Sequence, residues 1–190
     1  TCSKDIPRIV GSLTPDDIEA WGIHDQLAIL AEEIGDHASL GFYSGSIFPP
    51  AVRYLGGFEC AMELLATDPG LVREVVEAVA RRNAQRIITA EEYDPDFVWV
   101  TGYLDGADMI SPQHFREVIV PGYRILLPEA RRRGIKVLLW FLGDCMPLLE
   151  DIVDLGVDGL VVEQPRRGYS SDPGEIRRRI IRGQGSGVRG

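Results

Sequence analysis

Polar side chains that could do chemistry follow four short apolar runs in the sequence. The runs cover 39–45, 97–101, 136–141 and 159–163, and they are too short for typical helices, so we expect buried strands. In parallel sheets covered by helices, the chemistry lies just past the carboxyl ends of the strands. The polar candidates near these ends are Tyr43, Ser44, Tyr54, Tyr103, Asp105, Asp108, Asp144, Cys145, Glu163, Gln164, Arg166 and Arg167.

Asp105 and Asp108 form a carboxylate pair on the loop that follows the second predicted strand. Such a pair could act as general acid and general base, or could bind a cation. The structural alternative is that one carboxylate caps the following helix while the other is solvated. The sequence leaves both interpretations open.

Glu163 ends the fourth predicted strand, where a buried carboxyl would have a raised pKa and would need a partner. Arg166 and Arg167 follow it, and two guanidinium groups at this place could hold the carboxylates of an acidic substrate. The arginine runs 131–133 and 177–179 are instead expected to be solvated charges on helices.

Signals for a metal site or a reactive thiol are weak. Cys145 lies just after Gly143 with no His nearby in sequence, which favours a small buried residue over an activated thiol. His24, His37 and His114 have no ligand-like spacing, so we predict neither a zinc site nor any cofactor. The chain also lacks a P-loop, a G-x-G-x-x-G run and a G-x-S-x-G motif.

Helical patterns alternate with the predicted strands, which is typical of a parallel α/β architecture. Gly22 interrupts the first helix, and Pro121 and Pro128 are expected to kink or split a long one. A closed (β/α)₈ barrel needs eight strands and typically ~250 residues, so four strands indicate an open sheet or a partial TIM barrel. The predicted helices cover 14–35, 51–65, 68–93, 111–133, 147–155 and 174–182.

The composition is that of an ordinary globular protein, with 190 residues, 45% hydrophobic and 26% charged. A net charge of −9 argues against a general nucleic-acid binder, and there is no apolar run of membrane-spanning length. Three dispersed cysteines favour reduced thiols and a cytoplasmic location. The start at Thr1 and the Gly-rich end suggest a piece of a longer protein, with one domain over 1–182 and a flexible tail over 183–190.

Several short motifs follow one another in a fixed order along the chain. They are Gly57-Phe-Glu, Asp68-Pro-x-Leu-Val, Ile110-Ser-Pro-x-x-Phe-Arg-Glu with Pro121, Arg133-Gly-Ile-Lys-Val and Leu155-Gly-Val-Asp-Gly-Leu. Together, from about Gly41 to Ile180, they resemble the uroporphyrinogen decarboxylase superfamily, which also contains cobalamin- or corrinoid-dependent methyltransferases. The resemblance implies a (β/α)₈ barrel of which this chain supplies the third to sixth strands.

The two branches of that superfamily imply different site residues. The methyltransferases have a zinc-binding His-x-Cys pair at the end of the fifth strand, where this chain has Trp140 and Leu142, which cannot ligate a metal. The decarboxylase needs no metal and uses arginines and an aspartate from the first two strands, which are absent here. It also uses a tyrosine after the third strand, for which Tyr54 is the candidate, and a substrate-facing loop that matches 103–108.

The leading hypothesis is therefore a metal-free, uroporphyrinogen decarboxylase-like lyase that removes carboxylate from the acetate side chains of a tetrapyrrole-like substrate. Asp105 or Glu163 would stabilise the protonated pyrrole, with Tyr54 as a further catalytic candidate. The residues expected to bind the substrate are Tyr43, Tyr103, Asp108, Trp140, Arg166 and Arg167.

Two alternatives stay open. One is a methyltransferase-like protein with a lost zinc site, and the other is a non-catalytic binding domain in which Trp140 and Phe141 fill the mouth of the pocket. The expected partner is a small-molecule substrate, with a second copy of the chain or a corrinoid protein as partner hypotheses, and neither nucleic acid nor membrane is expected.

Overall fold

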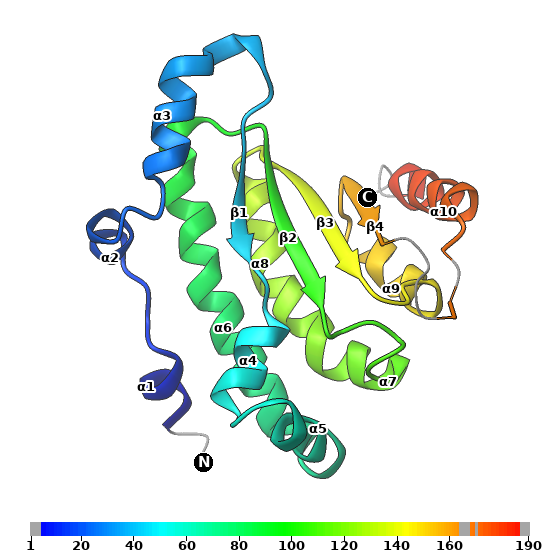
Figure 1. Cartoon of the computed structure of the whole chain (residues 1–190). Coiled ribbons are helices and arrows are strands. Elements are labelled where there is room, and N and C mark those ends of the chain that lie inside the picture. Colours follow the sequence, from blue (N-terminus) through cyan, green and yellow to red (C-terminus); the bar gives the residue numbers. More distant parts are fainter. Residues whose placement is uncertain (1–4, 164–167, 170, 187–190) are drawn as a thin grey trace.

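The computed structural model describes residues 5–163, 168–169 and 171–186 and contains a parallel sheet of four strands. The strands follow one another in space in their sequence order, and each neighbouring pair is parallel (Figure 1). This confirms the predicted α/β class. The strands are β1 (Gly41–Gly45), β2 (Phe97–Tyr103), β3 (Lys136–Leu142) and β4 (Gly159–Val162).

Helices connect the strands and flank the sheet. Short 3₁₀ segments cover Gly35–His37, Glu91–Tyr93 and Met146–Leu148, and a π-helical segment covers Phe115–Ile119. The α-helices are α1 (Ile6–Val10), α2 (Pro15–Ala20), α3 (Asp25–Ile34), α4 (Phe48–Tyr54), α5 (Phe58–Thr67), α6 (Pro69–Ala90), α7 (Pro112–His114), α8 (Val120–Arg132), α9 (Leu149–Asp154) and α10 (Pro173–Ser186). None of the helices in these described ranges is long and apolar enough to cross a membrane.

Three of the predicted helices are divided in the structure at or next to positions that the sequence marks with Gly or Pro. The first divides into α2 and α3 at a turn containing Gly22, and the second divides into α4 and α5 at Gly56 and Gly57. The third changes from a π-helical turn to α8 just before Pro121, whose missing N–H removes one regular hydrogen bond, while α8 continues through Pro128. At the other end of the chain, α10 continues to Ser186, past the domain boundary expected at 182.

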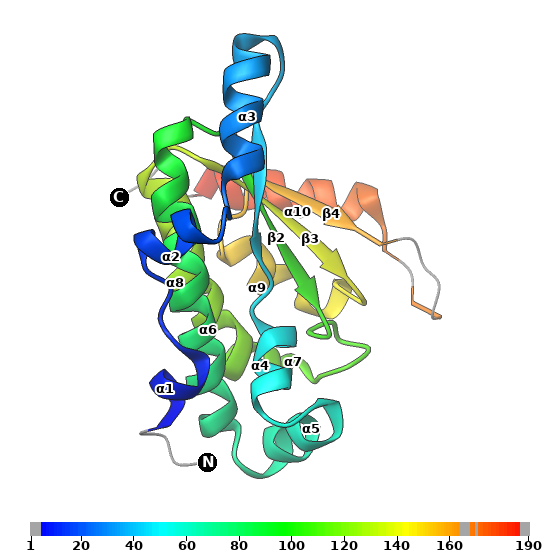
Figure 2. The same cartoon turned by 60° about the vertical axis from the view of Figure 1, so that its left-hand side comes forward.

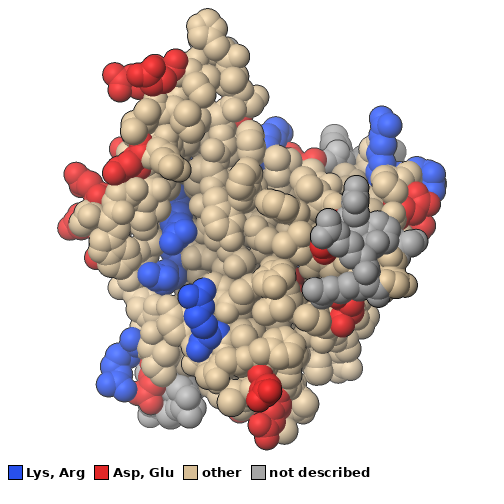
Figure 3. Space-filling view, viewed as in Figure 1, with Lys and Arg blue, Asp and Glu red and all other residues tan. Residues whose placement is uncertain are grey.

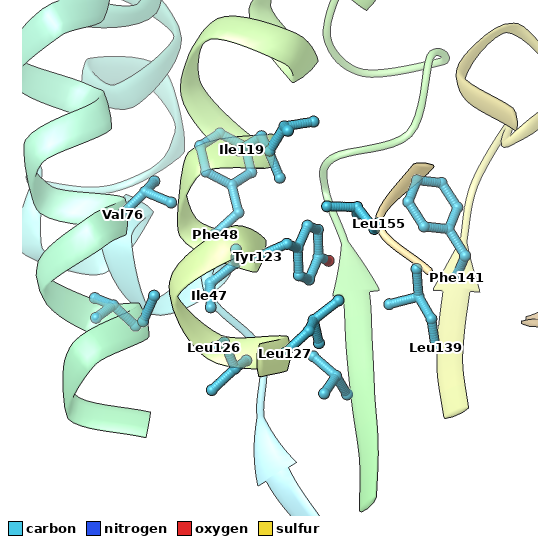
Figure 4. Close-up of a cluster of buried hydrophobic side chains, with 14 of the residues drawn as sticks. Ile47, Phe48, Val76, Ile119, Tyr123, Leu126, Leu127, Leu139, Phe141 and Leu155 are labelled. Atoms are coloured by element: carbon cyan, nitrogen blue, oxygen red, sulfur yellow. The ribbon is translucent and has the colours of Figure 1, made fainter. Parts of the chain in front are cut away.

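The hydrophobic core lies between one face of the sheet and the helix layer. Helices α6 and α8 pack against each other, α6 against β1 and α8 against β3. Figure 4 shows Tyr123, Leu126 and Leu127 of α8 between the strands and α6, with Leu139 and Phe141 of β3 pointing toward them. Alternate strand residues therefore enter the core, as a strand period of two requires.

The opposite face of the sheet is open in the described part of the chain. Figure 2 shows α6 and α8 on one side of the strands only. Trp99 and Trp140 are each 41% exposed on the open side, and Val161 of β4 is 48% exposed. The helices thus cover only one face of the described sheet, as in a segment of a (β/α)₈ barrel, whose inner face points to the barrel axis, and this agrees with the predicted partial TIM barrel.

Candidate functional site

The loops after β2 and β3 are joined into one edge at the carboxyl end of the sheet. The Ala107 N–H donates to the Asp144 carbonyl oxygen at 2.9 Å. The Asp144 N–H in turn donates to Asp108 Oδ1, also at 2.9 Å. Asp108 therefore holds the second loop, and its carboxylate is exposed at the same time.

This junction requires a residue without a side chain at position 143. Gly143 has φ +131°, and a Cβ there would lie 2.6 Å from Asp108 Oδ1. Gly143→Ala is thus expected to lower the free energy of unfolding by about 1–3 kcal/mol, as measured by urea titration. The matched control is Gly70→Ala in the first turn of α6, where the added Cβ meets only ordinary contacts and the change should be neutral or stabilising. Equal stability of the two variants would contradict the expected strain.

Asp105 lies behind the sheet rather than on its open face. Its side chain is 1% exposed, and the Tyr123 hydroxyl donates a hydrogen bond to its Oδ2 at 2.9 Å. Burial raises the pKa of the Asp105 carboxyl to about 7. Its Oδ1 is buried without a hydrogen-bond partner in the part of the chain that the structure describes. The group is therefore poised between its charged and neutral forms near neutral pH.

The position of Asp105 depends on an unusual backbone at Leu104. Strand alternation would place Asp105 on the same face as Tyr103, which is exposed on the open side. Leu104 has φ +68°, a left-handed conformation that is rare for such a residue, and it turns the chain toward α8. A strained residue next to a buried titratable carboxyl is typical of a functional loop.

Three aromatic side chains form a strip across the open face. The rings of Tyr43 and Trp99 have centroids 6.2 Å apart, and those of Trp99 and Trp140 are 6.3 Å apart in an edge-to-face arrangement. We call Tyr43, Trp99 and Trp140 the aromatic strip. It presents a large apolar surface on the open face of the sheet, which suits a flat aromatic ligand.

Strand alternation carried one residue past β4 assigns Glu163 to the same face of the sheet. Glu163 lies two residues after the exposed Val161, is half-buried, and accepts a hydrogen bond from the Tyr169 hydroxyl at 3.3 Å. The hydrogen-bond partner that we expected for the Glu163 carboxyl is thus the Tyr169 hydroxyl. Arg166 and Arg167, predicted to hold carboxylates, lie outside the described residues.

Other sequence candidates have structural partners. The Tyr54 hydroxyl donates to the Val10 carbonyl oxygen at 3.4 Å. Cys145 is buried, and burial raises the pKa of its thiol. This confirms the prediction that Cys145 is a small buried residue rather than an activated thiol. His24 is buried against Thr89, with 3.0 Å between its Nε2 and the Thr89 hydroxyl.

Trp99 and a group of arginines on α4 and α6 were not predicted as site residues from the sequence. Trp99 could have been found from period two, because it lies two residues from Thr101 and four from Tyr103 on one strand face. Arg82 and Arg86 lie one helical turn apart on α6, and Arg53 lies on α4 beside them at a shared cavity. In sequence they look like solvated charges, and only the fold brings them together.

A metal site would need ligands that the described residues do not supply as a group. In residues 5–163, 168–169 and 171–186, no three His, Cys, Asp or Glu side chains come together to hold an ion. Trp140 and Leu142 also carry no atom that ligates a metal.

Comparisons with known proteins identify the family and support the fold. A family model described as uroporphyrinogen decarboxylase (URO-D) matches residues 8–180, so the chain belongs to the uroporphyrinogen decarboxylase family. A solved methyltransferase from Methanosarcina mazei superposes with a TM-score of 0.74 at 16% sequence identity, over 89% of this chain and 49% of that chain. The chain therefore spans about half the length of that structure, and the likeness at this identity concerns the fold. No curated protein matches significantly.

Proposed function

We propose that the chain forms part of a metal-free decarboxylase whose flat, acidic, tetrapyrrole-like substrate lies on the aromatic strip. The single observation that carries this proposal is the strip itself, an exposed three-ring surface across the open face of the parallel sheet. Family membership supports the reaction class.

The reaction needs a temporary electron sink in the substrate. Protonation of a pyrrole ring provides it, so that the bond to the acetate carboxylate breaks, CO₂ leaves and the electron pair enters the ring. A proton then adds to the remaining methylene carbon to give a methyl group, and the ring proton is released. A carboxylate next to the cationic ring stabilises the charge that develops.

Glu163 is the best-placed carboxylate for that role. It follows β4 on the face of the strip and is half-buried, which strengthens its interaction with a cation. Asp105 is assigned a positioning role instead, since its buried hydrogen bond with Tyr123 connects the loop after β2 to α8.

The test is carboxyl loss from uroporphyrinogen kept reduced under anaerobic conditions and followed by mass spectrometry. Trp99→Ala and Trp140→Ala are each expected to lower kcat/KM about ten- to a hundredfold, because each removes a large ring surface from the substrate. Trp21→Ala is the control, since Trp21 is 61% exposed at the end of α2 and is not part of the strip. Wild-type protein that removes no carboxyl group, or strip variants as active as the control, would refute the proposal.

A further inference from the structure

A cavity beside β1 has a basic lining. It has a volume of about 490 Å³ and is lined by Arg53, Arg82 and Arg86, together with Tyr43 and Tyr54. We call this cavity the arginine pocket. Figure 3 shows basic side chains gathered beside the sheet, over α6 and α4. A cluster of three guanidinium groups is unexpected in a chain of net charge −9.

The arginines of the pocket have no carboxylate partner in the described part of the chain. Arg82 and Arg86 are half-buried, and the Nε atom of each is buried without a hydrogen-bond acceptor. Elsewhere on the same helix, Arg73 and Arg81 both form ion pairs with Glu77, at 3.4 and 3.5 Å. On its solvent side, α6 thus pairs its arginines with a carboxylate. At the pocket, its arginines have no carboxylate partner among the described residues.

Asp17 lies near Arg82 in charge terms but is not an ion-pair partner of it. Its charge interacts with Arg82 only through space, and its carboxylate accepts hydrogen bonds from the backbone and the hydroxyl of Thr14. Burial lowers the pKa of the Arg86 guanidinium, and the like charge of Arg82 lowers it further. Two cations held close together in a half-buried place raise the free energy of the empty pocket, and a bound anion would offset that.

A second cavity shares lining residues with both the arginine pocket and the aromatic strip. It has a volume of about 380 Å³, and its lining includes Arg86 and Tyr43 of the arginine pocket together with Trp99. A ligand whose ring lies on Trp99 therefore has Arg86 within reach of its substituents. The combination suits an aromatic body that carries anionic arms.

We infer that the arginine pocket binds the carboxylate arms of an aromatic polycarboxylate whose ring lies on the aromatic strip. The inference rests on the proposed function, which places the ring of the substrate on the aromatic strip. It deepens that function by assigning the residues that bind the carboxylates. Arginine suits this ligand because its planar fork donates two parallel hydrogen bonds to one carboxylate. Arg53, Arg82 and Arg86 take the role that the sequence suggested for Arg166 and Arg167.

The experiment measures binding of trimesate, a benzene ring with carboxylates at alternate positions, by calorimetry and by quenching of tryptophan fluorescence. Arg82→Gln and Arg86→Gln are each expected to weaken binding about ten- to a hundredfold, because each removes a charged hydrogen-bond donor. Arg73→Gln removes the same charge from α6 outside the pocket and should leave binding unchanged. Binding to wild-type protein should also weaken as salt is added.

Two further measurements make the result decisive. Arg86→Lys keeps the positive charge but loses the planar fork of the guanidinium group. Its affinity for trimesate is therefore expected to lie between those of wild type and Arg86→Gln. Thermal unfolding of each variant shows whether it is folded. Equal trimesate binding by wild type and both Gln variants, no binding at all, or inorganic phosphate binding more tightly than trimesate would overturn the inference.

The same experiment separates this inference from the proposed function. Arginine-dependent trimesate binding without carboxyl loss from uroporphyrinogen supports the pocket and refutes the decarboxylase. Carboxyl loss with arginine-independent binding supports the decarboxylase and refutes the pocket.

Discussion

Asp105→Asn is expected to remove a pH-dependent loss of stability that wild-type protein shows between about pH 4 and pH 7. In the folded chain, burial raises the pKa of Asp105 from its ordinary value of 3.8 to about 7. Between these values the folded state keeps a proton that the unfolded state has released, so stability falls as pH rises. The contribution is constant below the lower value and constant again above the higher one.

The size of the effect follows from the difference between the two pKa values. A difference between 3.8 and about 7 corresponds to about 4 kcal/mol of unfolding free energy. Asn cannot ionise and still accepts the hydrogen bond from Tyr123. The variant should therefore gain about 4 kcal/mol on wild type between pH 4 and pH 8, as measured by urea titrations at both pH values.

Controls distinguish this group from the other carboxyls. Asp154→Asn changes an exposed carboxyl at the end of α9 and should follow the wild-type pH profile within about 0.5 kcal/mol. Tyr123→Phe removes the hydroxyl whose hydrogen bond to Asp105 Oδ2 lowers the Asp105 pKa, so that pKa should rise further. An Asp105→Asn profile parallel to that of wild type would show that the carboxyl is not buried as described.

Phe141→Ala is expected to lower the free energy of unfolding by about 3–5 kcal/mol, the usual cost of a large cavity in a core. Phe141 is fully buried on the helix side of β3, and its ring contacts Phe115 edge-to-face with centroids 6.2 Å apart. The site cannot collapse easily, because the neighbouring Gly102 of β2 already lies against the Phe141 ring. Thermal or urea unfolding monitored by circular dichroism measures the loss.

The neighbouring residue provides the matched comparison. Trp140→Ala removes a larger side chain, but one that lies on the open face and is 41% exposed. Its stability should change by about 1 kcal/mol, the worth of an aromatic contact, while ligand binding falls. Similar losses of stability for the two variants would mean that both faces of β3 are covered in solution. Phe141 is buried on the helix side of β3, so it does not fill a pocket mouth, an arrangement that would have favoured the binding-domain alternative.

Local patterns were sufficient to predict the four strands of the described sheet and their parallel arrangement. Short apolar runs bounded by Gly, with helical patterns between them, predicted all four strands of the described sheet close to their observed bounds. The division of two helices at Gly22 and at Gly56–Gly57 follows from the same local chemistry. These features depend on backbone preferences and on the period of hydrophobic residues, and both are determined by residues close together in the sequence.

The face of each strand-end residue was harder to predict. The alternation that correctly places Tyr103 on the open side fails two residues later at Asp105, because Leu104 adopts a left-handed conformation. Nothing in the sequence Tyr103-Leu-Asp-Gly marks that turn. The buried partner of Asp105 is Tyr123, from the following helix, and the contact depends on the packing of α8 against the sheet.

The sequence alone therefore determined the parallel α/β class, the family and the edge of the sheet at which to look for chemistry. Only the tertiary structure decided that Asp105 lies behind the sheet, with Tyr123 as its partner. It also decided that Arg53, Arg82 and Arg86 share a pocket next to the aromatic strip. The physical reason is that strand and helix periods are local, whereas burial, pairing and pKa depend on side chains that the chain brings together from distant positions.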